Sequence, residues 1–81
     1  MRKTLIVSLD LVVASIFRHY GERDAMAIIG SPSSREIKDR VRNAFRLNIP
    51  VRTIMRRDKK VDFEFKFASI DDAVWFRLKW L

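Results

Sequence analysis

The stretch that decides the fold is VRTIMRRDKKVDFEFKF, residues 51 to 67. Its second half alternates apolar with charged residues, the period-two pattern of a strand with one buried face. The apolar members are Val61, Phe63, Phe65 and Phe67. The stretch predicts a β-hairpin with strands over 51 to 57 and 61 to 67, turning at residues 58 to 60. The phenylalanines are therefore expected in the core.

The segment before the hairpin has the pattern of an amphipathic helix over residues 34 to 47. Ser33 and Glu36 have the spacing of a capping box, and Asn48 and Pro50 follow the last apolar residue. The apolar face of this helix comprises Ile37, Val41, Ala44 and Phe45.

Residues 3 to 7 are rich in strand formers, and the apolar residues that follow recur at helical spacing up to Tyr20. Gly21 is placed to end that helix. We therefore expect a strand over 3 to 7 and a helix over 9 to 20. The same stretch also alternates well enough to form one long strand, so both readings stay open.

Residues 25 to 29 read as a second strand, because a Gly-Ser-Pro-Ser-Ser turn follows them. At the end of the chain, Ser69 with Asp72 predicts a cap that opens a helix over 70 to 81. On that helix the expected core face comprises Ile70, Val74, Leu78 and Leu81. The last residues also alternate as a strand would.

These elements predict one α+β domain over residues 1 to 81, in the order βαβαββα, with helices on one face of a mainly antiparallel sheet. The chain has no cysteine, so neither disulfides nor thiolate metal sites support its thin core. Oligomerisation would be a natural support. Asp10 interrupts the N-terminal apolar run, which argues against a signal peptide or membrane span. Because a chain without cysteine fits a reducing cytosol, we expect a cytoplasmic protein.

Positive charge is concentrated in residues 35 to 60, which hold ten cations against three anions and thus the whole net charge of +7. Such segregation is typical of a polyanion-binding surface. On the predicted helix the cations form a stripe away from the apolar face, and the hairpin is expected to continue it. The residues predicted to contact nucleic acid, with RNA favoured, are Arg35, Lys38, Arg42, Arg46, Arg52, Arg56, Arg57, Lys59 and Lys60.

The segment KVDFEFKFASIDDA, residues 60 to 73, resembles the third strand and following helix of RNA-recognition-motif domains. In that family, exposed aromatics of the strand stack on bases. Here the second face of the strand carries Asp62, Glu64 and Lys66, so the single apolar face must serve the core. The resemblance therefore implies a similar local shape and transfers no binding residue.

The ending FASIDDAVWFRLKW, residues 67 to 80, is similar to the ending of small tailed-phage proteins, in which an aromatic strand runs into a D-A-x-W-F-x-L-x-W close. This resemblance implies a phage accessory protein in the host cytoplasm that redirects or inhibits host proteins. It implies no chemistry.

Three aromatic residues near the C-terminus exceed what one helix of a thin domain easily buries. They are Trp75, Phe76 and Trp80, and they are the predicted partner interface. The alternative is that they close the edge of the core. His19 is the only histidine and lies near a predicted helix end, where a cation is favourable without any catalytic role.

We therefore expect a non-enzymatic protein without catalytic residues, cofactor or metal. The first hypothesis is a basic regulator that binds RNA or DNA through phosphates. The second is an inhibitor that covers an acidic host protein, with the aromatic C-terminus as its anchor.

Overall fold

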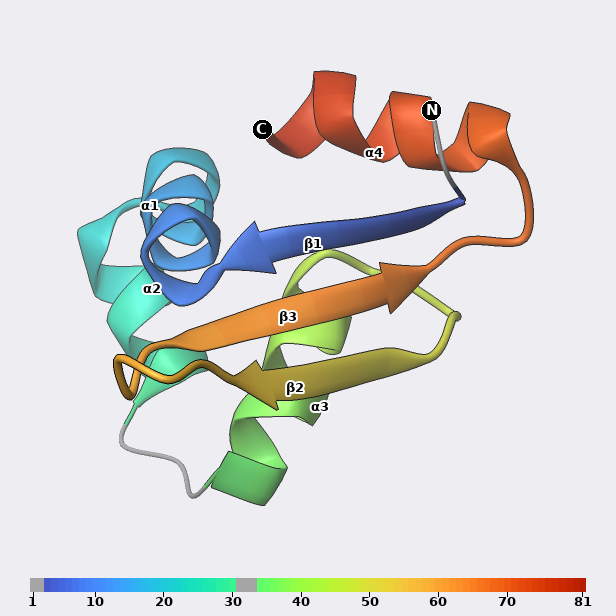
Figure 1. Cartoon of the computed structure of the whole chain (residues 1–81). Helices are drawn as coiled ribbons and strands as arrows, with labels where there is room; N and C mark the ends of the chain where they lie inside the picture. The colour runs from blue at the N-terminus through green and yellow to red at the C-terminus, as the bar shows by residue number, and fades with distance from the viewer. Residues whose placement is uncertain (1–2, 31–33) are drawn as a thin grey trace.

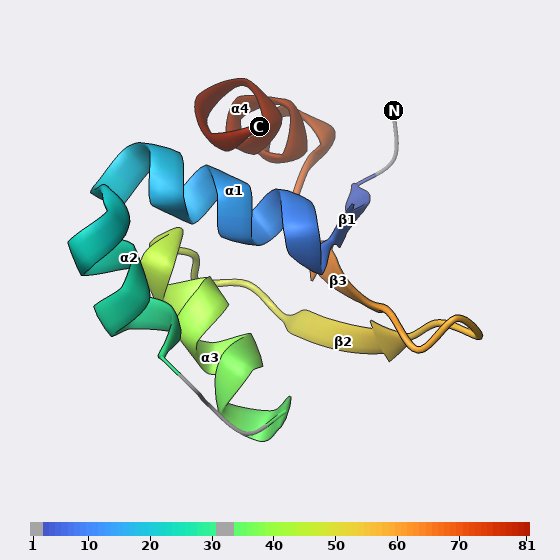
Figure 2. The ribbon, with the colours of Figure 1, turned by 90° about the vertical axis from the view of Figure 1, so that its left-hand side faces the viewer.

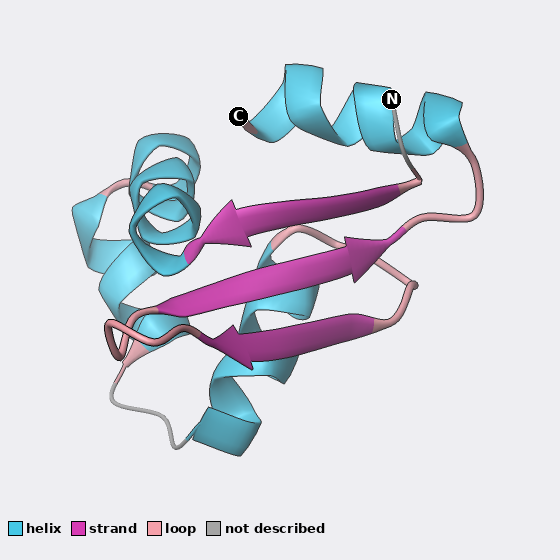
Figure 3. Cartoon of the chain, viewed as in Figure 1, coloured by secondary structure: helices cyan, strands magenta, loops and turns pink. Residues whose placement is uncertain are grey.

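The computed structural model describes residues 3–30 and 34–81, which form a three-stranded antiparallel sheet and four helices (Figure 1). The strand order is β1-β3-β2, so the last strand in sequence lies in the middle. All four helices lie on one side of the sheet (Figure 2), and its other face is open. The predicted α+β class is confirmed (Figure 3). The elements are β1 (Thr4–Ser8), α1 (Leu9–Tyr20), α2 (Glu22–Ile29), α3 (Ser34–Ala44), β2 (Val51–Met55), β3 (Val61–Lys66) and α4 (Ile70–Trp80).

The predicted hairpin is present as β2 and β3, with Val51 opposite Phe65 and Met55 opposite Val61. β2 ends at Met55 and the turn lies one residue earlier than predicted, because Arg56 pairs with Lys60. Alternation along β3 turns its phenylalanines toward the helices, as the sequence indicates. Phe63 and Phe65 are fully buried and Phe67 nearly so. These three side chains form the floor of the core.

The first helix is also confirmed, and the alternative long strand is wrong. The Ser8 side chain caps α1 by accepting a hydrogen bond from the Leu11 amide, and Gly21, at φ 83°, ends it. A positive φ carries no steric cost in glycine, which allows the chain to turn directly into the next helix.

The strand predicted over residues 25 to 29 is wrong, because this segment lies within helix α2. Ala25, Ile28 and Ile29 recur at helical spacing and pack on the core. Glu22 and Asp24 favour a helix here, since carboxylates in a first turn complement the positive N-terminal end of the dipole. The order observed is therefore βαααββα.

Helix α3 ends at Ala44, earlier than predicted, because Arg46 takes a left-handed conformation with φ 55°. The Leu47 amide donates to the Arg42 carbonyl and the Arg46 amide to that of Asn43, the two bonds of a Schellman motif. Of the predicted capping box, Ser33 lies outside the described residues.

In α4 the predicted cap is present, since the Ser69 hydroxyl accepts from the Asp72 amide at 3.1 Å. The predicted core face is wrong for Ile70 and Leu78, whereas Leu81 packs on the core and Val74 is half-buried. Ala73, Phe76 and Trp80 are buried, whereas Leu78 is 74% exposed and Ile70 46% exposed. The helix therefore packs through the neighbouring stripe, where Phe76 meets the aromatic floor and Trp80 meets Phe45.

The centre of the core is Phe45 at the end of α3. Its ring lies edge-on to Phe65 in the sheet, and to Phe76 and Trp80 in α4, with centroid distances of 6.1, 5.1 and 4.9 Å. Aromatic pairs in this geometry are favoured beyond the area that they bury. One residue thus connects α3, α4 and the sheet.

Candidate nucleic-acid interface

The hairpin tip is a three-residue loop, Arg57 to Lys59, held by two backbone bonds. The Arg56 amide donates to the Lys60 carbonyl at 2.8 Å, and the Lys59 amide to the Arg56 carbonyl at 3.0 Å. Lys59 has φ 66°, so a type I turn is followed by a left-handed residue, a standard three-residue hairpin. This turn defines the direction in which the tip cations leave the backbone.

The Asp58 carboxylate holds the tip together from within. It accepts from Arg56 Nη2 at 2.7 Å and Nε at 3.3 Å, and from the Lys60 amide at 3.1 Å. The bond from Arg56 lowers the pKa of Asp58 below its usual range, and the Lys60 amide lowers it further. The same bond raises the pKa of Arg56, followed by the charge of Asp58 and then that of Asp62. Arg56 is thereby fixed in the turn.

On the open face of the sheet, the carboxylates of β3 face Arg52 of β2 and Arg56, which directly follows β2. Arg52 lies opposite Glu64 and contacts both of its oxygens at 3.3 Å, while Arg56 Nη1 lies 3.5 Å from Asp62. Glu64 is only 9% exposed although no helix covers it, and its Oε1 takes the ion-pair contact without a well-directed hydrogen bond. Because these arginines neutralise nearly buried carboxylates, they are structural cations.

The cations of α3 lie on the flank of that helix and beyond its end. Arg42 pairs with Asp39 at 2.9 Å, and Arg40 donates to the Ile28 carbonyl at 3.0 Å, which ties α3 to α2. Lys38 is half-buried, and Arg46 is exposed after the helix. The side chain of Arg35 lies outside the described residues.

The single continuous basic surface that the sequence predicts is divided by the sheet. Helix α3 packs on the helix side, where its Phe45 meets Phe65. Arg52 and Arg56 project from the opposite face, where they meet the β3 carboxylates. The predicted residues therefore form two groups, one along α3 and one at the hairpin, and in each group an arginine is already paired.

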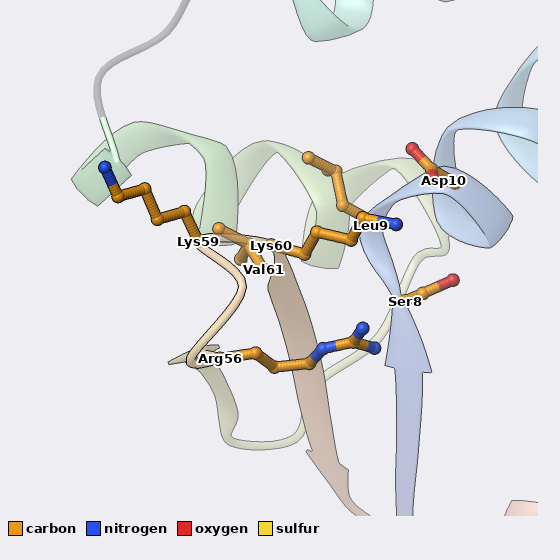
Figure 4. Close-up of a pocket in the computed structure, with 7 residues that line it drawn as sticks. All are labelled: Ser8, Leu9, Asp10, Arg56, Lys59, Lys60 and Val61. Atoms are coloured by element: carbon orange, nitrogen blue, oxygen red, sulfur yellow. The ribbon is translucent and has the colours of Figure 1, made fainter.

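The hairpin group borders a notch of about 250 Å³ at the start of α1 (Figure 4). Arg56, Lys59 and Lys60 line it from one side, and Ser8, Leu9 and Asp10 from the other. Sequence reasoning did not place the start of α1 here, because the approach depends on β1 pairing with β3 across 54 or more residues. The amides of a first helical turn and the lysines favour an anion in this notch, whereas Asp10 opposes one.

Of the three aromatics predicted as a partner interface, only Trp75 lies on the surface, with 72% of its area exposed. Phe76 and Trp80 are buried in the core, which is the alternative that the sequence left open. His19 is exposed and packs on Trp80 with ring centroids 4.5 Å apart. Its contact is thus a structural one at the core margin.

Comparisons with family models, curated proteins and solved structures gave no match to this chain. Within residues 3–30 and 34–81, no helix is long and apolar enough to cross a membrane. The same residues include no group of three or more histidines, cysteines or carboxylates arranged to hold a metal ion.

Proposed function

We propose that the protein binds nucleic acid through phosphate contacts at the hairpin tip. The observation that carries this proposal is that the side chains of Arg57, Lys59 and Lys60 are exposed and, among the residues that the structure describes, unpaired. All three side chains are exposed at this single ordered turn, Arg57 and Lys59 in the loop and Lys60 directly after it. Within the described chain, none of the three forms an ion pair. Arg56, in contrast, is held by Asp58 and orders the loop that presents them.

Free cations on an ordered loop favour phosphate binding for two reasons. Each phosphate contact releases condensed counterions from the nucleic acid, which supplies most of the affinity of non-specific complexes. The loop is ordered before binding, so less conformational entropy is lost on association. Cations that already neutralise a carboxylate must first exchange partners, so we expect Arg42 and Arg52 to contribute less.

The contact is to phosphates, which RNA and DNA share, so the bases add little specificity. We therefore expect sequence-independent binding. Fluorescence polarisation with a short single-stranded RNA and a short duplex DNA at two salt concentrations measures both affinity and preference. Three phosphate contacts predict slopes of log affinity against log salt of about −2 for the single strand and about −3 for the duplex.

The sharpest variant is Lys59→Ala with Lys60→Ala, compared with Arg23→Ala combined with Lys66→Ala. Both pairs remove two exposed cations and leave the same net charge, but the control pair lies on α2 and on the open face of the sheet. The tip variant should reduce the salt slope by about 2 units for the duplex. Equal losses in both variants would show that only net charge matters and would contradict a site at the tip.

The charge reversal Arg42→Glu with Arg46→Glu tests the other basic group. If the tip is the main site, this variant weakens binding through the long-range field but retains the salt slope of the tip contacts. A complete loss of binding would move the site to α3. Absence of binding at low salt to either nucleic acid would reject the proposed function.

A further inference from the structure

Strand β1 forms one edge of the sheet. At every second residue of β1, the backbone N–H and C=O groups are not hydrogen-bonded to another strand of the described chain. The Phe67 amide donates to the Lys3 carbonyl at 3.0 Å, so Lys3, and by alternation Leu5 and Val7, direct their N–H and C=O groups to β3. The amides of Thr4, Ile6 and Ser8 therefore point away from the sheet.

Within its five residues, β1 lacks two features by which proteins usually prevent strand addition. The five residues of β1 include neither a charged residue nor proline. The opposite edge, β2, is preceded by Pro50 and carries the exposed Arg52. In β1 the corresponding exposed side chain is Ile6, an apolar residue with 57% of its area accessible. β1 is thus the more receptive edge.

A groove of about 460 Å³ runs beside this edge, between β1, α1 and the C-terminal half of α4. Helix α4 extends alongside β1 in the helix layer, so it walls one side of the groove while the strand edge stays open (Figures 1 and 2). Leu11, Leu81 and Arg77 line the groove together with residues of β1. An added strand would therefore have backbone pairing on one side and an apolar wall with a guanidinium on the other.

The charged side chains around the groove are positive and favour a negatively charged ligand. Arg77 lines the groove and Lys3 is exposed where β1 begins, and neither forms an ion pair within the described residues. Within that part of the chain, no aspartate or glutamate side chain lines the groove. A second copy of this chain would bring the same cations to the contact. An acidic segment from another protein is complementary instead.

We propose that β1 binds an extended acidic segment of a partner protein by strand addition. Main-chain bonds to Thr4, Ile6 and Ser8 would give affinity, and the side chains of the segment that face α4 would give specificity. Apolar residues of the segment would pack on Leu11 and Leu81, and a carboxylate would meet Arg77. This proposal is independent of nucleic-acid binding, because it uses another edge of the sheet and none of the tip cations.

The probe is a fluorescein-labelled peptide with a Val-Val-Glu-Glu repeat, which places both valine and glutamate on each face of an extended strand. It is about seven residues long, which is sufficient to span β1. Polarisation measures its binding, and amide NMR shifts locate it. The expected result is a shift of the Thr4, Ile6 and Ser8 amides with slowed hydrogen exchange. N-methylation of alternate peptide amides should abolish binding in one register and spare it in the other, because only every second amide faces the protein.

The matched protein variants are Ile6→Pro and Ile6→Thr. Both remove the isoleucine, but only proline removes the outward amide, which β1 does not need for pairing with β3. We expect at least a tenfold loss of peptide affinity for Ile6→Pro relative to Ile6→Thr. Arg77→Glu should weaken binding, whereas Arg23→Glu, the same charge change on α2, should not.

The outcomes that overturn the proposal are distinct. One is absence of binding up to about 1 mM peptide. The second is equal affinity of both N-methylated peptides, which would indicate a purely ionic contact, and the third is equal affinity of the two Ile6 variants. Should Ile6→Pro fail to fold, the two N-methylated peptides still decide the question on the unaltered protein. Nucleic-acid affinity is expected to be unchanged in Ile6→Thr, so the two proposals can fail separately.

Discussion

Arg18 Nη2 donates a hydrogen bond of 2.7 Å to the carbonyl oxygen of Trp80, which joins the end of α1 to the end of α4. The buried Ser15 hydroxyl donates to the same oxygen at 2.5 Å. Carbonyls in the last turn of a helix have no partner within the helix. Two side chains of α1 supply the partners here, so the position of α4 depends on α1 as well as on the aromatic core.

Replacing Arg18 by alanine should therefore lower the free energy of unfolding by about 1 to 2 kcal/mol, since a bond from a charged donor is lost. Urea denaturation followed by tryptophan fluorescence measures the change. Arg23→Ala, which removes an exposed cation of α2, is the control and should stay within about 0.5 kcal/mol of the wild type. Equal effects of the two substitutions would show that the Arg18 bond adds nothing to stability.

Arg46 is a second testable position, because it occupies the left-handed conformation that ends α3. A side chain there costs about 1 kcal/mol relative to glycine. Arg46→Gly should therefore stabilise the protein by about that amount, whereas Arg46→Ala, which removes the same charge and retains a Cβ, should not. Thermal unfolding of the two variants makes the comparison. A higher melting temperature for the alanine variant would contradict this account of the Schellman motif.

The sequence was sufficient for the hairpin and for α1, because each has a single period and clear end signals. β3 alternates strictly, and Ser8 and Gly21 bracket the first helix. The strand predicted over residues 25 to 29 was wrong because the segment is short, and an apolar run of that length fits both the helical and the strand period. The charged first turn from Glu22 to Asp24 was the signal that would have identified the helix.

The face of α4 could not be predicted, because the helix is apolar on two sides. Ile70, Val74 and Leu78 form as regular a stripe as Ala73, Phe76 and Trp80 do. Tertiary contacts select the aromatic stripe for burial, since Phe45, directly after α3, packs on both Phe76 and Trp80. The sheet adds contacts to Phe76, and α1 holds the end of α4. The division of the basic surface also depends on tertiary structure. Strand alternation sends Arg52 and Arg56 to one face of the sheet, and α3 packs on the other face.

Substitution of each tryptophan tests which face of α4 is buried. Trp80→Ala should destabilise the protein by about 3 to 5 kcal/mol, because it removes a buried ring packed on Phe45. Trp75→Ala should change stability by less than about 0.5 kcal/mol, as its side chain is exposed. Chemical denaturation measures both, and acrylamide should quench the fluorescence of Trp75 preferentially. The reverse order of the two effects would show that α4 packs through its other face.

The Asp58 carboxylate makes the hairpin tip sensitive to acid. Its pKa is lowered in the folded chain, chiefly by the bond from Arg56. The resulting stability is present above the ordinary carboxyl pKa of about 4 and is lost as the pH falls through the lower folded value. Carbon-13 NMR titration should find the Asp58 pKa below its usual range. Arg56→Gln should move that pKa upward, whereas Arg57→Gln should have little effect on it.

Lys59 combines stability and function in one residue, because it is both a left-handed position of the turn and a cation of the proposed site. Lys59→Gly should stabilise the hairpin by about 1 kcal/mol, since glycine adopts a positive φ without strain. The same variant should lose one phosphate contact, which reduces the salt slope for duplex binding by about 1. Lys59→Ala should lose the same contact without any gain in stability. A glycine variant that is more stable yet binds nucleic acid with an unchanged salt slope would remove Lys59 from the site and leave its role to the turn alone.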